Sequence, residues 1–201
     1  MNLNASSLPP LARRVYSHNE LLHRALSMKR TERLSRVARL CCHCLRNIAF
    51  YRAGWRSRQI RVARPFWINA NSNCLDVAVL EWCKLFADSR GKHHWKRVIP
   101  DRARFLTGMC QHLGMSSKEF RAYATSVLRY RNRFVAHLDD DRTMQIPMMR
   151  IARSSAAYLL EYLLRGPESI SFLLDAPESA SEFYGILYRH AYQEYGRGHE
   201  G

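Results

Sequence analysis

The chain has 201 residues, a hydrophobic fraction of 47% and a formal net charge of +15. This length and apolar content suffice for a buried core and exclude a wholly disordered chain. There is no signal-peptide core and no apolar run long enough to cross a membrane. We therefore expect a soluble, cytoplasmic protein whose six cysteines are reduced.

The charge is distributed unevenly along the chain. Residues 1–64 hold 14 Lys and Arg against 2 Asp and Glu, whereas residues 167–201 hold 2 against 6. Such a basic segment indicates a polyanionic partner, with nucleic acid favoured over a membrane. The alternative interpretation is a solvated basic helix face with no partner.

Helical periodicity dominates the first half of the chain. Apolar residues recur every three to four positions over 11–28 and again over 31–51, which predicts two helices. A basic, aromatic connector follows over 52–65, where the periodicity is lost. The next stretch, 69–87, is the most apolar and predicts a central core helix.

The segment from Ser116 to Asp141 predicts a helix with one unusual feature. Ser116 and Glu119 have the spacing of a capping box, in which each side chain accepts a hydrogen bond from a backbone N–H at the helix start. Five apolar residues then share one face of an ideal helix, and Arg131 lies in the middle of that face. Because a guanidinium keeps its charge, an arginine there requires an anion, a partner chain or a path to water.

The remaining segments complete the predicted fold. Further helices are expected over 103–112, from Pro147 to a stop at Gly166-Pro167, and over 179–192. No strand pattern is convincing, so the predicted fold class is all-α, a bundle of about five to seven helices. The predicted divisions are a basic N-terminal segment packed on the bundle, a main helical domain and a frayed tail, at 1–64, 65–195 and 196–201.

Two clusters contain potential metal ligands. The residues of Cys41-Cys42-His43-Cys44 occupy successive positions of a predicted helix and point around its whole circumference, whereas zinc ligands must converge. We interpret these cysteines as core thiols. The His93-His94 pair is flanked by lysines and an arginine, which favours contact with a phosphate over a metal. We expect neither a metal nor another cofactor.

The residues at 131–137 suit metal-independent cleavage of RNA. This reaction needs a base for the 2′-hydroxyl, an acid for the departing 5′-oxygen, and cations at the phosphate. His137 titrates near neutrality, and Arg131 offers a planar fork for phosphate. Since one chain supplies a single histidine here, a symmetric dimer would bring two together. The alternative is a structural arginine bonded to carbonyls, with His137 as a surface residue at a helix C-terminus.

The run RNRFVAHLD at 131–139 resembles the signature of the HEPN superfamily (higher eukaryotes and prokaryotes nucleotide-binding domains), in the branch related to abortive-infection proteins. Arg131, Asn132 and His137 fit the family pattern, with five residues between the arginine and the histidine. The resemblance covers roughly residues 66–165. It implies an α-helical, commonly dimeric bundle with the motif at the dimer cleft. It also implies metal-independent endoribonuclease activity, often in toxin–antitoxin or phage-defence systems.

The resemblance also implies roles for individual residues. His137 would be the acid–base group, Arg131 would bind the phosphate and Asn132 would orient the site. Helical geometry, and not the resemblance, places Arg133 one turn from His137, where we expect it to assist in binding substrate. The expected partners are RNA, a second copy of the chain and an antitoxin or defence-system protein, with no membrane. Some HEPN domains carry a modifiable tyrosine where this chain has Asp139, which argues against regulation by that route.

Two other functions remain open from the sequence. The first is a non-catalytic HEPN-type module that binds RNA or a protein, and the second is a basic DNA-binding or scaffold protein. Helical geometry adds one constraint, since Arg131 and His137 lie about 120° apart on an ideal helix. Either the helix bends at the motif or a second subunit completes the site, and we expect the second.

Overall fold

A computed structural model of the protein describes the backbone of residues 18–135, 145–166 and 177–200. Within these ranges the side chains are described for 30–135, 145–166 and 177–198. The described residues are mostly helical, with one small hairpin, so the all-α prediction is confirmed at this level.

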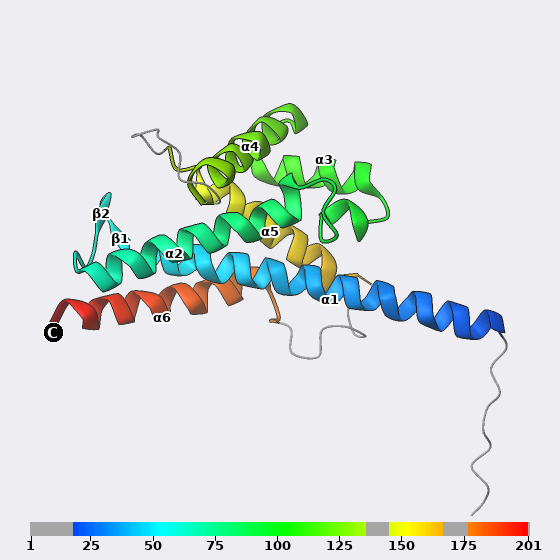
Figure 1. The fold of residues 1–201 in the computed structure, drawn as a ribbon, viewed down its shortest axis with the longest axis horizontal. Coiled ribbons are helices and arrows are strands. Elements are labelled where there is room, and N and C mark those ends of the chain that lie inside the picture. Colours follow the sequence, from blue (N-terminus) through cyan, green and yellow to red (C-terminus); the bar gives the residue numbers. More distant parts are fainter. Residues whose placement is uncertain (1–17, 136–144, 167–176, 201) are drawn as a thin grey trace, which may run out of the picture.

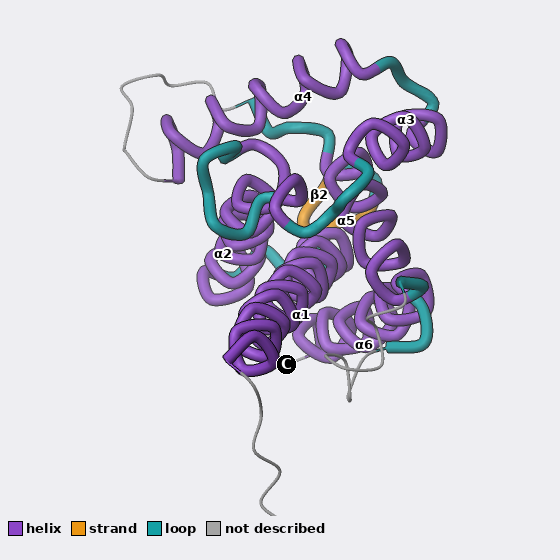
Figure 2. The backbone as a smooth tube through the Cα atoms, turned by 90° about the vertical axis from the view of Figure 1, so that its right-hand side faces the viewer, coloured by secondary structure: helices purple, strands orange, loops and turns teal. Residues whose placement is uncertain are grey.

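A single long helix, α1 (His18–Ala53), forms the spine of the molecule. It contacts α2 (Pro65–Trp82), α5 (Met149–Leu164) and α6 (Ala180–Glu200), which lie around it in Figures 1 and 2. The prediction of two separate helices, over 11–28 and 31–51, is wrong for the described residues. The segment His18–Ala53 contains no proline or glycine, so nothing in it interrupts the helix before Gly54.

The basic connector after α1 contains a short hairpin that we did not predict. Strands β1 (Trp55–Arg56) and β2 (Gln59–Ile60) pair antiparallel, with Trp55 opposite Ile60. Ser57 and Arg58 make the turn with φ of 48° and 67°. Positive φ at both central residues is the type I′ hairpin turn, whose positions asparagine and glycine usually occupy. Because Ser57 and Arg58 are neither, the turn could not be recognised from the sequence.

The next helix begins at Pro65, where a proline is well tolerated, and so four residues before the predicted start. A π-helical turn, η1 (Cys83–Ala87), extends α2 to the predicted end. A loop with a short 3-10 turn, η2 (Trp95–Arg97), leads to α3 (Arg102–Leu113). Gly114 ends α3 with a φ of 66°, the left-handed conformation that favours glycine at a helix end.

Helix α4 (Ser117–Tyr130) begins with the predicted capping box. The Glu119 carboxylate accepts from the backbone N–H of Ser116 at 2.6 Å, and Ser116 Oγ accepts from the N–H of Glu119 at 3.2 Å. The α-helix ends at Tyr130 and is followed by a second π-helical turn, η3 (Arg131–Val135). The helix start was thus predicted correctly, but its regular geometry stops at the motif.

Helix α6 continues beyond its predicted end at Tyr192 and reaches Glu200. Gly198 allows a close approach in this part of the helix, because a Cβ there would lie 2.7 Å from the Trp67 ring. The aromatic face of α6 also packs near the end of α1, where Tyr195 joins Ala53 and Val62 in a small second core. The tail is therefore anchored by a contact with α2 that composition alone did not indicate.

The main core is centred on Trp82, which is fully buried. Its ring lies 5.2 Å from those of Phe86 and Tyr123 and 6.1 Å from that of Phe120, so an aromatic cluster joins α2 and η1 to α4. Cys41 and Cys44 are also fully buried, which confirms their interpretation as core thiols. Among the described helices, none is long and apolar enough to cross a membrane.

Candidate functional site

The predicted motif begins in the π-helical turn η3, which packs against both α4 and α2. Arg131, Asn132 and Arg133 belong to this turn, whereas His137 lies outside the described residues. A π turn has more residues per turn than an α-helix, so the angle expected from an ideal helix does not apply here. The helix changes its geometry at the motif, whereas we expected a regular helix completed by a second subunit.

Arg131 lies half-buried at the junction of α4 and η3. Its Nε atom is buried and has no hydrogen-bond partner among the described residues. This matches the expectation of an arginine on an otherwise apolar face. A buried guanidinium N–H without an acceptor is costly, and it identifies a position where an external acceptor would be favoured.

The surroundings of Arg131 include the thiol of Cys83, at the start of η1. Burial raises the pKa of Cys83 to about 12, and the positive charge of Arg131 acts in the opposite direction. The thiol is therefore neutral near pH 7 and provides no counter-charge. Arg131 therefore has an uncharged, buried neighbour in Cys83.

The other residues of η3 divide between the surface and the core. Asn132 is exposed, whereas Phe134 and Val135 are half-buried and pack against the main core. The rings of Phe134 and Tyr130 lie 5.5 Å apart, which fixes the turn to the end of α4. Arg133 is half-buried and has an interaction of its own. Asn132 is therefore the residue of the three most open to a ligand.

Asp76 was not predicted as part of the site. It lies on α2, close enough to the buried Tyr130 to help burial raise the pKa of that tyrosine to about 12. Partial burial in turn raises the pKa of Asp76. Asp76 thus acts on Tyr130, the residue that immediately precedes the motif. Its only sequence signal is an aspartate within the apolar run CLDVAVLEW.

The two π-helical turns lie at the same interface. Turn η1 extends α2 and contacts α4, while η3 extends α4 and contacts α2. Such turns cost helix stability and occur frequently at functional sites, where they redirect side chains. Within the described residues, no other interface has a π-helical turn on each side.

His93 and His94 are neighbours in one loop but differ in burial. His94 is buried, its Nε2 donates to Phe86 O at 3.1 Å, and its Nδ1 accepts from the N–H of Lys96 at 3.2 Å. Burial lowers the pKa of His94, consistent with a neutral ring that anchors the loop. His93 is only half-buried. Only His93 is thus placed to meet the predicted phosphate.

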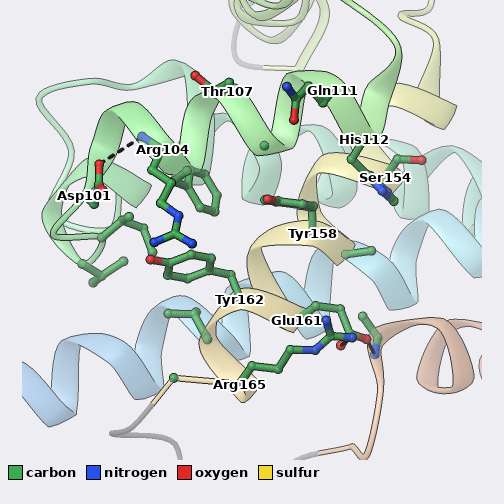
Figure 3. Close-up of a pocket in the computed structure, with 18 of the residues that line it drawn as sticks. Asp101, Arg104, Thr107, Gln111, His112, Ser154, Tyr158, Glu161, Tyr162 and Arg165 are labelled. Carbon is green, nitrogen blue, oxygen red and sulfur yellow. Dashed lines mark hydrogen bonds and ion pairs between the residues drawn. The ribbon is translucent and has the colours of Figure 1, made fainter.

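A cavity with a volume of about 1290 Å³ lies elsewhere, between α3 and α5 (Figure 3). Arg104, Tyr158 and Tyr162 line it, and Asp101 accepts from the backbone N–H of Arg104 at 3.0 Å at the start of α3. None of the predicted site residues described in the structure lines this cavity. The cavity and the motif are therefore separate features.

No group of three or more His, Cys, Asp or Glu side chains in the described part of the chain is arranged to hold a metal ion. Comparisons of the chain with protein-family models, with curated proteins and with solved structures found no match. The resemblance to the HEPN superfamily therefore rests on the motif, and the structure adds the setting of Arg131.

Proposed function

We propose that the protein is a metal-independent endoribonuclease of HEPN type that acts in a toxin or phage-defence system. The observation that carries the proposal is the buried, unpartnered Nε of Arg131 at the first position of the motif. A cation held in this way is prepared to bind an anion, and the scissile phosphate of RNA supplies one.

In this proposal Arg131 binds the phosphate and stabilises its developing charge. His137 transfers the protons between the 2′-hydroxyl and the 5′-oxygen, and a second copy of the chain contributes the second histidine. Asn132, which is exposed, orients the phosphate or the histidine, and Arg133 adds to substrate binding. An antitoxin or other defence protein would restrain the activity in the cell.

The direct test is cleavage of a labelled single-stranded RNA by purified protein in the presence of EDTA. We expect wild-type protein to cleave it and both Arg131→Ala and His137→Ala to lose at least about a hundredfold in rate, which is typical for acid–base and charge-stabilising groups. Arg129→Ala, an exposed arginine on α4, is the matched control and should retain activity. Circular dichroism and light scattering should show unchanged fold and oligomeric state.

Mixing wild-type protein with an excess of His137→Ala tests the shared site. Because the proposed site takes one histidine from each subunit, a mixed dimer lacks one of them and should be inactive, so activity should fall with about the square of the wild-type fraction. A site made within one chain would lose activity only in proportion to the fraction of wild-type chains. Full cleavage by both single variants would overturn the enzyme proposal. RNA binding without cleavage by wild-type protein would favour the non-catalytic module instead.

A further inference from the structure

A second, smaller pocket joins two parts of the chain that are distant in sequence. Its volume is about 350 Å³, and it lies between α1 and the loop that leads from η1 to α3. Arg33 and Arg36 of α1 face Arg90, Lys92 and Arg97 of the loop. All five side chains are exposed, so a ligand from solution can reach them.

Two buried residues of the loop, His94 and Trp95, fix the backbone that carries the cations of the pocket. The two hydrogen bonds of His94 tie the loop to Phe86 and to the turn at Lys96. Next to it, Trp95 is buried with its ring 4.9 Å from that of Phe105 on α3. The loop cations therefore project from an anchored backbone, and less ordering is required when a ligand binds.

The pocket has a large excess of positive charge. Five cations and one carboxylate line it, a net charge of +4 when His93 is neutral. The carboxylate, Glu32, forms an ion pair with Arg36, one turn further along α1. Arg33 and Arg97 have no ion-pair partner among the described residues. Cations gathered this closely repel one another, so an anion placed between them relieves the repulsion.

His93 adds an observation that is independent of charge. Its Nδ1 atom is buried and has no hydrogen-bond partner in the described part of the structure. Burial lowers the pKa of His93, and so do the charges of Arg36, Lys84 and Lys92, against the opposite effect of Glu81. A buried ring nitrogen normally has a hydrogen-bond partner. A ligand oxygen, or a water bound to the ligand, would supply the partner that Nδ1 lacks here.

The lining also indicates which part of a ligand is recognised. Among the described residues it contains only charged side chains and one histidine, with neither an aromatic nor an aliphatic side chain. Such a pocket has no apolar wall to enclose a base or an alkyl chain, whereas arginine forks match phosphate oxygens. We propose that this pocket binds adjacent phosphate groups, through Arg33, Arg36, Arg90, Lys92 and Arg97.

Two sources supply adjacent phosphates, and the test separates them. Isothermal titration calorimetry measures the binding of inorganic triphosphate, and fluorescence anisotropy measures the binding of a short 2′-O-methyl oligoribonucleotide. The 2′-O-methyl groups remove the nucleophile of the proposed cleavage, so binding is measured whether or not the chain is a ribonuclease. The proteins are the wild type, Arg33→Gln/Arg97→Gln, and a control with the same loss of charge, Arg102→Gln/Arg189→Gln.

We expect Arg33→Gln/Arg97→Gln to weaken binding of at least one ligand by about tenfold or more, because each lost arginine removes a charge-assisted contact. The control should remain within about twofold, since Arg102 and Arg189 are exposed and lie outside the pocket. An effect on triphosphate alone identifies a free polyphosphate ligand, and an effect on the oligonucleotide alone identifies backbone phosphates. Equal weakening in both double variants, or wild-type protein that binds neither ligand, would overturn the proposal.

Discussion

The indole N–H of Trp82 donates a hydrogen bond of 2.9 Å to Ser155 Oγ, which joins α2 to α5 in the middle of the core. Both residues are fully buried, and the Ser155 hydroxyl lies within 2.9 Å of Ile151 O. The pair satisfies two polar groups that the aromatic cluster otherwise surrounds with apolar atoms.

Replacement of Ser155 by alanine should destabilise the protein by about 1–3 kcal/mol, because the Trp82 N–H then remains buried without an acceptor. Urea denaturation followed by circular dichroism measures the free energy of unfolding. The neighbouring Ser154→Ala is the matched control, since Ser154 is less buried and should change stability by less than about 0.5 kcal/mol. Equal losses in the two variants would show that the hydrogen bond contributes nothing specific.

Gly54 should not tolerate a side chain. A Cβ at this position would collide with the Asn71 amide and lie 2.8 Å from Tyr195 Cζ. Asn71 accepts from Trp55 Nε1 at 2.9 Å and donates to Tyr51 O and Tyr195 Oη, so it cannot move without breaking these bonds. Gly54→Ala should therefore cost at least about 2 kcal/mol of unfolding free energy.

The control for Gly54 is a glycine in open space. A Cβ on Gly196 would meet nothing within 4 Å, and the residue lies inside α6. Gly196→Ala should stabilise the protein by about 0.5–1 kcal/mol because alanine favours the helix. Thermal unfolding of both variants measures the contrast, and the two substitutions should shift the melting temperature in opposite directions.

Stability should fall in mildly acidic solution because of His94. Burial holds the pKa of this histidine below its usual value, so the unfolded chain binds a proton that the folded protein resists. The stability contributed by the neutral ring is complete above about pH 6.5. It is lost as pH falls from there toward the lowered folded pKa, by at most about 1.4 kcal/mol per pH unit.

The pKa of His93 is lowered as well and contributes in the same direction. Urea denaturation at about pH 7.5 and about pH 5.5 measures the total effect. His94→Gln should reduce this pH dependence, although it lowers stability at neutral pH by loosening the loop. A pH dependence that is unchanged by His94→Gln would assign the effect to other groups.

Arg131 should lower the stability of the fold although the proposed function requires it. Its Nε is buried without a partner among the described residues, so Arg131→Met should raise unfolding free energy by about 1 kcal/mol and, under the proposed function, abolish RNA cleavage. A purely structural arginine would give the opposite result, a loss of stability. Thermal unfolding and the cleavage assay on the same preparation separate the two cases.

The sequence predicted the features that depend on local patterns. The capping box of Ser116 and Glu119, the helical character of the chain and the burial of Cys41 and Cys44 follow from spacing and composition, and the structure confirms them. The unusual position of Arg131 also followed from helical periodicity. These predictions succeeded because neighbouring residues determine them.

Other features depend on tertiary packing or on rare backbone geometry. Ser57 and Arg58 form a hairpin turn without the usual asparagine or glycine, and the π turn at Arg131 departs from the regular period on which the motif geometry was derived. Arg33 and Arg97 line the same pocket although they lie far apart in the sequence. No local pattern contains that information, so only the fold could supply it.

The contact between α1 and α6 has a consequence for how the protein reaches its active form. Helix α6 leaves the ribosome long after α1, yet Tyr195 of α6 completes the small core against Ala53 and Val62. Until Tyr195 is in place, Ala53 and Val62 remain uncovered and Asn71 lacks its hydrogen bond to Tyr195 Oη. A partly made chain therefore exposes apolar surface to chaperones. The core at the end of α1 is therefore completed only when the last helix of the described chain has been made.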